Sequence, residues 1–379
     1  MPGAYLGKPA PAAAPRRFNM SYTIPIGPYH PSLEEPVHAR LTVDGEKIVG
    51  AKVEIGYNHR GIEKLATQRN FIQTAVLVER VCGICSHSHA MTYCLAVERI
   101  AGMEIPKRGQ YLRVLTAELE RIHSHLLWLG IACHIIGHDS LFMQTWNDRE
   151  FTMDVLENLT GNRVNYAMNT VGGARRDITD EQRKMVIAAM DDLDVKMQPI
   201  VDFLTNDKTV AMRTQGVGVL TREDAIRIGA VGPHARASGV DIDVRRDQPY
   251  TSYGDFEFAV PVVDSGDVFA RVVVRVLETL ESMKIVRQCV DMLPEGPINL
   301  GKKIPKVPAG EAILSHEAPR GQLVYKVVTK GGPYNHRVSI HVPTFKNCPT
   351  VPTMLMNNTV AEAGLIVASI DPCFSCMDC

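Results

Sequence analysis

Apolar residues that recur every three or four positions predict three long amphipathic helices in this chain. The predicted spans run from about Pro106 to Ile136, from about Asp180 to Leu204, and from after Ser265 to about Met292. Thr179 and Gln182 predict a capping box at the start of the second helix, and Pro199 predicts a kink within it. Shorter helices are expected at 61–79, 91–100 and 352–364.

Alternation of apolar and polar residues predicts a few short strands. The segment 37–57 alternates around Asp44 and Gly45, which is a strong hairpin signal. Two further strands are expected at 321–328 and 337–342, with an extended segment at 365–370. Loops are expected at 236–262 and 294–310. The prediction is therefore a predominantly α-helical α+β fold, a long-helix bundle with small peripheral antiparallel sheets.

The pattern contains no clear domain boundary, so we expect one domain over residues 21–379 after a flexible N-terminal arm, residues 1–20. The 379-residue chain is 45% hydrophobic, which indicates a globular protein with a large core. Its net charge of −1 argues against a nucleic-acid surface. Residues 1–17 lack the apolar centre of a secretory signal, which favours a cytoplasmic, reducing location.

We do not expect the chain itself to cross a membrane. Its most apolar uncharged stretch, Ser124 to His138, is about 15 residues long, whereas a spanning helix needs about 20. Any link to a membrane must therefore come through a partner.

Two Cys-x-x-Cys pairs, Cys82 with Cys85 and Cys373 with Cys376, lie near opposite ends of the chain. Four thiolates suit zinc, iron–sulfur clusters or nickel and iron. A structural zinc remains an alternative on these residues alone. Its pairs usually lie within about 20 residues of each other, which disfavours zinc here. If both pairs bind one metal centre, that centre joins the N- and C-terminal segments.

The surroundings of both pairs resemble the large, catalytic subunit of [NiFe] hydrogenases. The resemblance includes residues 79–85 with His89, residues 56–64, residues 318–321, and the Asp-Pro-Cys-x-x-Cys of residues 371–376. Residues 118–127 resemble in particular the energy-converting, membrane-bound group, and this stretch is shared with the homologous large subunit of respiratory complex I.

The resemblance implies a nickel–iron centre. It implies that Cys82 and Cys373 bind nickel terminally and that Cys85 and Cys376 bridge nickel and iron. It further implies carbonyl and cyanide ligands on the iron, inserted by maturation proteins.

Four further residues receive roles from the resemblance. Glu63 would relay protons, Arg320 would lie over the metals, Asp371 would support Arg320, and His89 would donate to a bridging sulfur. The residues alone also allow plainer roles: a helix-start carboxylate, a surface arginine, a turn residue and an exposed histidine.

The implied function is reversible reduction of protons to H2 by a membrane-associated, energy-converting hydrogenase. The remaining cysteines are too few for electron-transfer clusters, so these belong to an iron–sulfur small subunit. Membrane subunits would move ions, and ferredoxin would carry electrons, with formate-linked relatives as another possibility. The chain would then lie at the inner face of the cell membrane.

The alternative is a quinone-reducing subunit like that of complex I, or a sulfur-reducing relative. Tyr93 and the 27–31 loop with His30 resemble positions near the quinone in complex I. The intact cysteine pairs count against both branches. A zinc-stabilised scaffold without enzymatic activity is the third hypothesis.

The other cysteines and two histidines carry weaker signals. Cys94, Cys133, Cys289 and Cys348 stand in apolar surroundings typical of buried small residues. His134 and His138 have metal-like spacing, but no supporting motif, so we expect structural or interface roles. Cys379 occupies the position where the family usually has His or Arg, and its role is unexplained.

Overall fold

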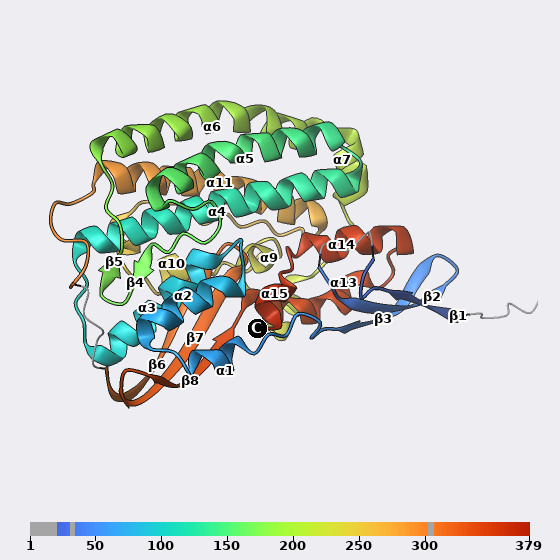
Figure 1. Ribbon diagram of the computed structural model, residues 1–379. Coiled ribbons are helices and arrows are strands. Elements are labelled where there is room, and N and C mark those ends of the chain that lie inside the picture. Colours follow the sequence, from blue (N-terminus) through green and yellow to red (C-terminus); the bar gives the residue numbers. More distant parts are fainter. Residues whose placement is uncertain (1–20, 31–34, 302–306) are drawn as a thin grey trace, which may run out of the picture.

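Four long helices form one layer, and the sheets and short helices that carry the cysteine pairs lie against one side of it (Figure 1). The computed structural model describes residues 21–30, 35–301 and 307–379. The long helices are α4 (Lys107–Ile136), α5 (Asp139–Thr160), α6 (Asp180–Asn206) and α11 (Val268–Asp291). With two three-stranded antiparallel sheets, this confirms the predicted predominantly helical α+β fold.

Helix α4 lies at the centre of the bundle, in contact with both α5 and α11. Leu112 and Leu126 of the predicted apolar stripe are 0% exposed, but so are Glu118, Glu120 and Arg121. The helix is therefore buried well beyond its apolar stripe. Buried charges must find partners: Arg121 pairs with Glu118 within α4, and further partners come from other elements.

The predicted start of the second long helix is confirmed in detail. Thr179 Oγ1 accepts a hydrogen bond from Gln182 N at 3.2 Å, and Gln182 Oε1 accepts one from Thr179 N at 2.9 Å. Helix α6 continues through Pro199, and the kink stays a prediction. Helix α11 begins after Asp267, whose carboxylate accepts from Ala270 N at 2.8 Å.

The first sheet contains the predicted hairpin and one further strand. Its order is β1 (Ser21–Ile26), β2 (His38–Asp44) and β3 (Lys47–Glu54). Gly45 has φ of 63° in the turn between β2 and β3, a conformation that favours glycine.

The second sheet has one strand that the sequence did not predict. Its order is β6 (Val307–Ala318), β7 (Gly321–Gly332) and β8 (Asn335–His341), so the two predicted strands are confirmed. The loop predicted for 294–310 was wrong at its end, because β6 starts at Val307. Pairing of β6 with β7 over almost its whole length supplies the backbone partners. A two-stranded ribbon of β4 (Asn169–Thr170) and β5 (Gly173–Ala174) completes the described sheets.

Predicted helices on either side of the first cysteine pair differ in extent. The helix expected at 61–79 is split into α1 (Ile62–Ala66) and α2 (Phe71–Val78), because Asn70 forms a capping box with Gln73 that starts a new helix. A short 3-10 turn, η1 (Glu79–Val81), leads to the cysteines. Helix α3 (Ser86–Ala101) then begins five residues before the predicted span.

The tail after residue 350 was partly misassigned. The expected helix at 352–364 is interrupted: α13 (Val351–Leu355) is followed by the 3-10 turn η4 (Val360–Glu362). The expected extended segment at 365–370 was wrong, because α14 (Ala363–Ser369) is helical. A short apolar run does not distinguish strand from helix by itself. Here α14 packs on α4, and Trp128 Nε1 donates to Ala368 O at 2.8 Å.

The remaining elements connect the bundle to the sheets. They are α7 (Lys208–Thr214), α8 (Arg222–Ile228), α9 (Gly232–Arg236), α10 (Val244–Asp247), η2 (Tyr253–Asp255), α12 (Pro343–Asn347), η3 (Cys348–Thr350) and α15 (Phe374–Met377). Helix α5 had no counterpart in the sequence analysis. The proposed arm, residues 1–20, lies outside the described residues, and the single domain stays a prediction.

Candidate metal centre

The four cysteines of the two pairs meet at one buried place. The Sγ atoms of Cys85 and Cys376 are 3.3 Å apart, those of Cys82 and Cys373 are 3.5 Å apart, and those of Cys373 and Cys376 are 3.1 Å apart. None of the four residues is more than 5% exposed, and all four are free cysteines. The fold therefore brings together the two ends of the chain, as the sequence predicted.

Both pairs stand at the start of a helix. Cys85 is the N-cap residue of α3, and Cys373 is the N-cap residue of α15. The first N–H groups of a helix carry partial positive charge, which favours a thiolate. Figure 1 shows α15 at the C-terminal end of the chain, below the layer of long helices and beside the β6–β8 sheet.

The thiols differ in their ease of ionisation. Hydrogen bonds from Cys373, Cys376 and Cys85 lower the pKa of Cys82 well below its usual value, whereas burial raises the pKa of Cys376. Four thiolates in one buried place would repel one another, so all four can ionise only around a cation. The donor set fits a metal centre with sulfur ligands.

Arg320 and Asp371 form a buried ion pair beside the thiols. Arg320 Nη2 lies 2.7 Å from Asp371 Oδ1, and Arg320 Nε donates to Asp371 O at 2.9 Å. Arg320 Nη1 and Asp371 Oδ2 are buried without a hydrogen-bond partner among the described residues. Arg320 also lies within electrostatic range of Cys373, Cys85 and Cys82. A free donor there fits a bound group that carries hydrogen-bond acceptors.

A glycine contact determines where the turn bearing Arg320 can lie. A Cβ on Gly232 would come within 2.3 Å of Gly321 Cα and 2.6 Å of Arg320 O. The close approach of the two backbones therefore requires glycine at position 232.

His89 joins the cysteines to the second sheet. Its Nε2 lies 3.5 Å from Cys376 Sγ, and its Nδ1 lies 2.7 Å from the hydroxyl of Tyr325 on β7. Burial lowers the pKa of His89 to about 4, so the ring is neutral near pH 7. The structure thus places His89 beside the sulfur that the resemblance implies as its partner.

Glu63 is turned toward strand β8. Its Oε1 accepts from Ile340 N at 2.8 Å, and its Oε2 accepts from Arg337 Nη2 at 2.8 Å. Its side chain is 25% exposed. Glu63 still lies within electrostatic range of Cys379 and Tyr325. These contacts account for both carboxylate oxygens without a cysteine.

Glu35 is a carboxylate at the centre that the sequence analysis missed. Its Oε2 accepts from the backbone N atoms of Phe374 and of Ser375, the latter at 3.0 Å, and its Oε1 lies 3.9 Å from Cys373 Sγ. Burial raises its pKa. Neither spacing nor periodicity marks Glu35, because it reaches the cysteine pair across 338 positions of sequence.

Arg60 was also missed, although it stands in one of the resembling segments. Its Nη2 donates to Val81 O and to Ser375 O, both at 2.7 Å. Those carbonyls directly precede Cys82 and Cys376 in the chain. Arg60 therefore ties the two cysteine segments together.

The last residues are held from the same side. Asp378 Oδ2 accepts from the backbone N atoms of Gly56 and Asn58, both at 3.0 Å. His59 Nδ1 lies 3.0 Å from Asp378 O. The loop before α1 thus receives the C-terminal turn.

The single cysteines behave as predicted. Cys94, Cys133, Cys289 and Cys348 are all buried, and burial raises the pKa of each thiol. His134 lies on the surface beside Asp139, with 2.6 Å between Nδ1 and Oδ1, and its structural or interface role stays a prediction. Cys379 is partly buried, and burial raises its pKa to about 11. It lies beyond the four-thiol cluster, and its role is still unassigned.

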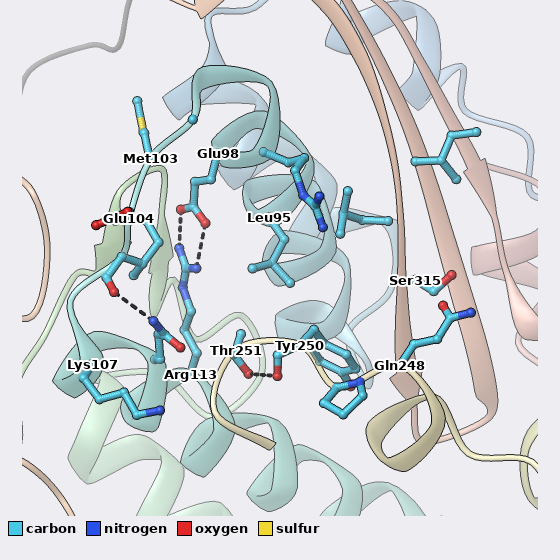
Figure 2. Close-up of a pocket in the computed structure, with 17 residues that line it drawn as sticks. Leu95, Glu98, Met103, Glu104, Lys107, Arg113, Gln248, Tyr250, Thr251 and Ser315 are labelled. Carbon is cyan, nitrogen blue, oxygen red and sulfur yellow. Dashed lines mark hydrogen bonds and ion pairs between the residues drawn. The ribbon is translucent and has the colours of Figure 1, made fainter. Parts of the chain in front are cut away.

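A cavity of about 910 Å³ lies away from the cysteines (Figure 2). The end of α3, the start of α4, the loop 248–251 and strand β6 line it. Glu98 and Arg113 form a buried ion pair in its wall, with Arg113 Nη2 to Glu98 Oε1 at 2.6 Å. None of the four paired cysteines lines this cavity, so its size does not identify the functional site.

Comparison with known proteins identifies the family. Residues 136–305 and 299–379 match the family described as "Respiratory-chain NADH dehydrogenase, 49 Kd subunit", and residues 60–131 match "Nickel-dependent hydrogenase". The chain is 42% identical to the carbon monoxide-induced hydrogenase of Rhodospirillum rubrum, over 94% of this chain and 99% of that protein. The chain belongs to the family of membrane-bound hydrogenase large subunits related to the complex I 49 kDa subunit.

Two more relatives show the breadth of this hydrogenase–complex I family. The membrane-bound hydrogenase subunit alpha of Pyrococcus furiosus is 43% identical, over 94% of this chain and 87% of that protein. A chain in the structure of the membrane-bound sulfane sulfur reductase, an archaeal respiratory membrane complex, superimposes with a TM-score of 0.90 at 32% identity, over 95% of this chain and 98% of that one.

The structure also bears on the membrane. Across residues 21–30, 35–301 and 307–379, no helix has both the length and the apolar character that crossing a bilayer requires. Two of these relatives, the Pyrococcus furiosus hydrogenase and the sulfane sulfur reductase, are named as membrane-bound.

Proposed function

We propose that this chain is the catalytic subunit of an energy-converting [NiFe] hydrogenase and reversibly reduces protons to H2. One observation carries the proposal: four free, buried thiols from both ends of the chain are in mutual contact beside an unpaired arginine donor. The family match over residues 60–131, which include Cys82 and Cys85, supports it.

The residues divide the binding of the centre among themselves. Cys82, Cys85, Cys373 and Cys376 would hold nickel and iron, and the resemblance implies Cys82 and Cys373 as ligands of nickel alone and Cys85 and Cys376 as ligands shared by both metals. The free Nη1 of Arg320 would donate to carbonyl or cyanide ligands on the iron, with Asp371 orienting the guanidinium. When bound, the centre supplies the two-electron chemistry that interconverts H2 with protons and electrons.

Proton transfer needs a carboxylate near a sulfur, and two candidates stand on the described residues. Glu35 approaches Cys373 at 3.9 Å between Oε1 and Sγ. Glu63, which the resemblance implies, uses its oxygens on Arg337 and Ile340. We assign the role of first proton acceptor to Glu35, because a proton relay requires hydrogen-bond reach. Glu63 would act farther from the metal centre. His89 would donate to the Cys376 sulfur and orient it.

The proposal includes partners that this chain needs for turnover. Electrons would arrive through iron–sulfur clusters of a small subunit, with ferredoxin as the carrier. Membrane subunits would couple turnover to ion movement, and maturation proteins would insert the centre. The chain would lie on the cytoplasmic side, attached to the inner face of the membrane by these subunits.

Metal analysis and infrared spectroscopy of the purified protein test the proposal together. We expect one nickel and one iron per chain, with absorption bands from iron-bound carbonyl and cyanide, and H2 evolution from a reduced electron donor. Zinc as the only metal, with neither band, would overturn it.

The quinone-reducing alternative is tested by the same preparation. Tyr93, which resembles a position near the quinone in complex I, is 0% exposed, and its hydroxyl donates to Asn335 Oδ1 at 3.0 Å. Electron transfer to a quinone or to sulfur without H2 turnover would favour that alternative instead.

A further inference from the structure

Helix α3 begins at the N-terminal cysteine pair but has no cap from its own sequence. Cys85 occupies the N-cap position, and its side chain makes no capping hydrogen bond. The first N–H groups of a helix have no partner within it, and an N-cap Ser, Thr, Asp or Asn normally accepts from the second or third of them. Cys85 faces Cys376 instead, so another group must satisfy these donors.

Glu120 of α4 supplies the missing acceptors from a different helix. Its Oε2 accepts from His87 N at 2.7 Å, and its Oε1 accepts from Ser88 N at 3.0 Å. His87 and Ser88 are the second and third residues of α3, the positions that an N-cap side chain would serve. Ser88 Oγ also donates to Glu120 Oε1, at 2.5 Å.

Glu120 makes this contact with both of its side-chain oxygens. Glu120 is 0% exposed, and its oxygens are the acceptors in all three hydrogen bonds. Burial raises the pKa of Glu120 to about 8, and the hydrogen bonds oppose that rise. Neither backbone donor has a lone pair that could accept a carboxyl proton, and only Ser88 Oγ could, so both backbone hydrogen bonds of the cap form with Glu120 in either protonation state.

We propose that Glu120 is a positioning residue for the metal centre, which caps α3 in place of Cys85 and so leaves the Cys85 thiol free to bind metal. The identity of the metal rests on the proposed function, whereas the cap stands on the hydrogen bonds alone. The first turn of α3 also carries His89, whose N donates to Cys85 O at 3.3 Å and whose Nε2 approaches Cys376. Cys85 and His89 would therefore shift together if the cap were lost.

The first test is amide hydrogen exchange in the full chain carrying Glu120→Gln. A glutamine offers one acceptor oxygen, and its NH2 group would face the other N–H donor, so one helix N–H loses its partner. We expect exchange at residues 86–89 to speed up by about fivefold, the factor that corresponds to loss of a typical N-cap.

The second readout concerns the metal-loaded protein. We expect Glu120→Gln to retain nickel and iron but to shift or split the infrared bands of the carbonyl and cyanide ligands. A general loss of stability would not move these bands.

The matched control lies at the other end of the same helix. Glu98 is also buried and uses both oxygens, accepting from Arg113 Nη1 at 2.9 Å, from Arg113 Nη2 at 2.6 Å and from Gly172 N at 2.8 Å (Figure 2). Glu98→Gln should leave exchange at 86–89 and the infrared bands unchanged. Glu120→Asp keeps both carboxylate oxygens and should give an intermediate exchange rate. It also serves as the test if the glutamine variant does not fold, with wild-type exchange then counting against the cap.

Three outcomes would overturn the inference. If Glu120→Gln exchanged at 86–89 as slowly as the wild type, the capping role would be ruled out. An equal effect of Glu98→Gln would also rule it out. Faster exchange with unchanged infrared bands would remove the role at the metal. If the wild-type protein shows no such bands, the proposed function fails, while the exchange arm still decides whether Glu120 caps α3.

Discussion

The N-terminal cysteine pair starts a 16-residue helix inside the protein, whereas the C-terminal pair starts a four-residue helix in the last residues of the chain. Both helices receive a carboxylate from a distant segment. Glu120 is fully buried and uses both oxygens on α3, while Glu35 is half-buried and uses one oxygen on the backbone of α15. The first carboxylate therefore comes from the long-helix bundle and the second from the segment before β2, while all four thiols are buried.

This difference indicates an order of events. The N-terminal pair can form its site when the bundle folds, but the site is complete only when the last residues have docked. Metal binding adds its free energy to that docking. The predictions below, from the largest expected effect to the smallest, test whether the two halves of the site are independent in this way.

The largest effect should follow from deletion of residues 373–379. Two of four thiolates disappear, so we expect almost complete loss of nickel while the four long helices keep their circular dichroism signal and cooperative thermal unfolding. Cys379→Ser alone should retain nickel, as a control for the tail. Loss of cooperative unfolding in the truncated chain would show that the C-terminal segment belongs to the core after all.

Glu35→Gln should slow H2 turnover by about 100-fold or more, because general acid–base groups contribute at least that much. The variant can keep both backbone hydrogen bonds to α15, since they go to Oε2, and its amide nitrogen can take the place of Oε1 and donate to Ser375 Oγ. Glu63→Gln should change turnover only a few-fold, with nickel retained in both. The reverse order of effects in a hydrogen-evolution assay would restore the role that the family resemblance implies for Glu63.

Arg60→Ala should loosen the C-terminal pair and leave the N-terminal pair in place. The guanidinium ties Val81 O to Ser375 O, and loss of these charged hydrogen bonds from an exposed side chain should cost about 1.5 kcal/mol. We expect about tenfold faster loss of nickel to a chelator. Arg222→Ala provides the control, because Arg222 is also exposed and donates to a backbone carbonyl, that of Gly239. Equal rates of nickel loss in the two variants would argue against a role of Arg60 in holding the two cysteine segments together.

The smallest effect concerns pH and the N-terminal side. Burial raises the pKa of Glu79, which stands three residues before Cys82, from 4.5 to about 7. A raised carboxyl pKa means that the folded state binds the proton more tightly, so this contribution to stability is full below pH 4.5 and is lost as pH rises through about 7. Denaturant unfolding of the metal-free chain at pH 5 and pH 8 should show a larger decline in the wild type than in Glu79→Gln. Equal declines would mean that Glu79 is ionised without cost.

Local signals predicted much of the fold. The three-and-four spacing located α4, α6 and α11, and the Asp44–Gly45 turn located the first hairpin. Strand β6 and the helical form of α14 escaped prediction, because strand pairing and packing on α4 decide them. Helix α5 was also missed.

The site divides in the same way. The resembling motifs identified the cysteines, Arg320, Asp371 and His89, and the structure brings all of them together. Glu35 and Glu120 carry no signal in spacing, since each acts on a segment far away in sequence.

By itself, the sequence determined the donors: four thiols in two Cys-x-x-Cys pairs, and a helical framework able to bury them. Only the tertiary structure decided which carboxylates reach those pairs and which arginine joins them. The physical reason is that spacing within a segment dictates only local geometry. The partner of a free helix N–H or of a buried thiol is whichever group the folded chain brings within about 3 Å of it.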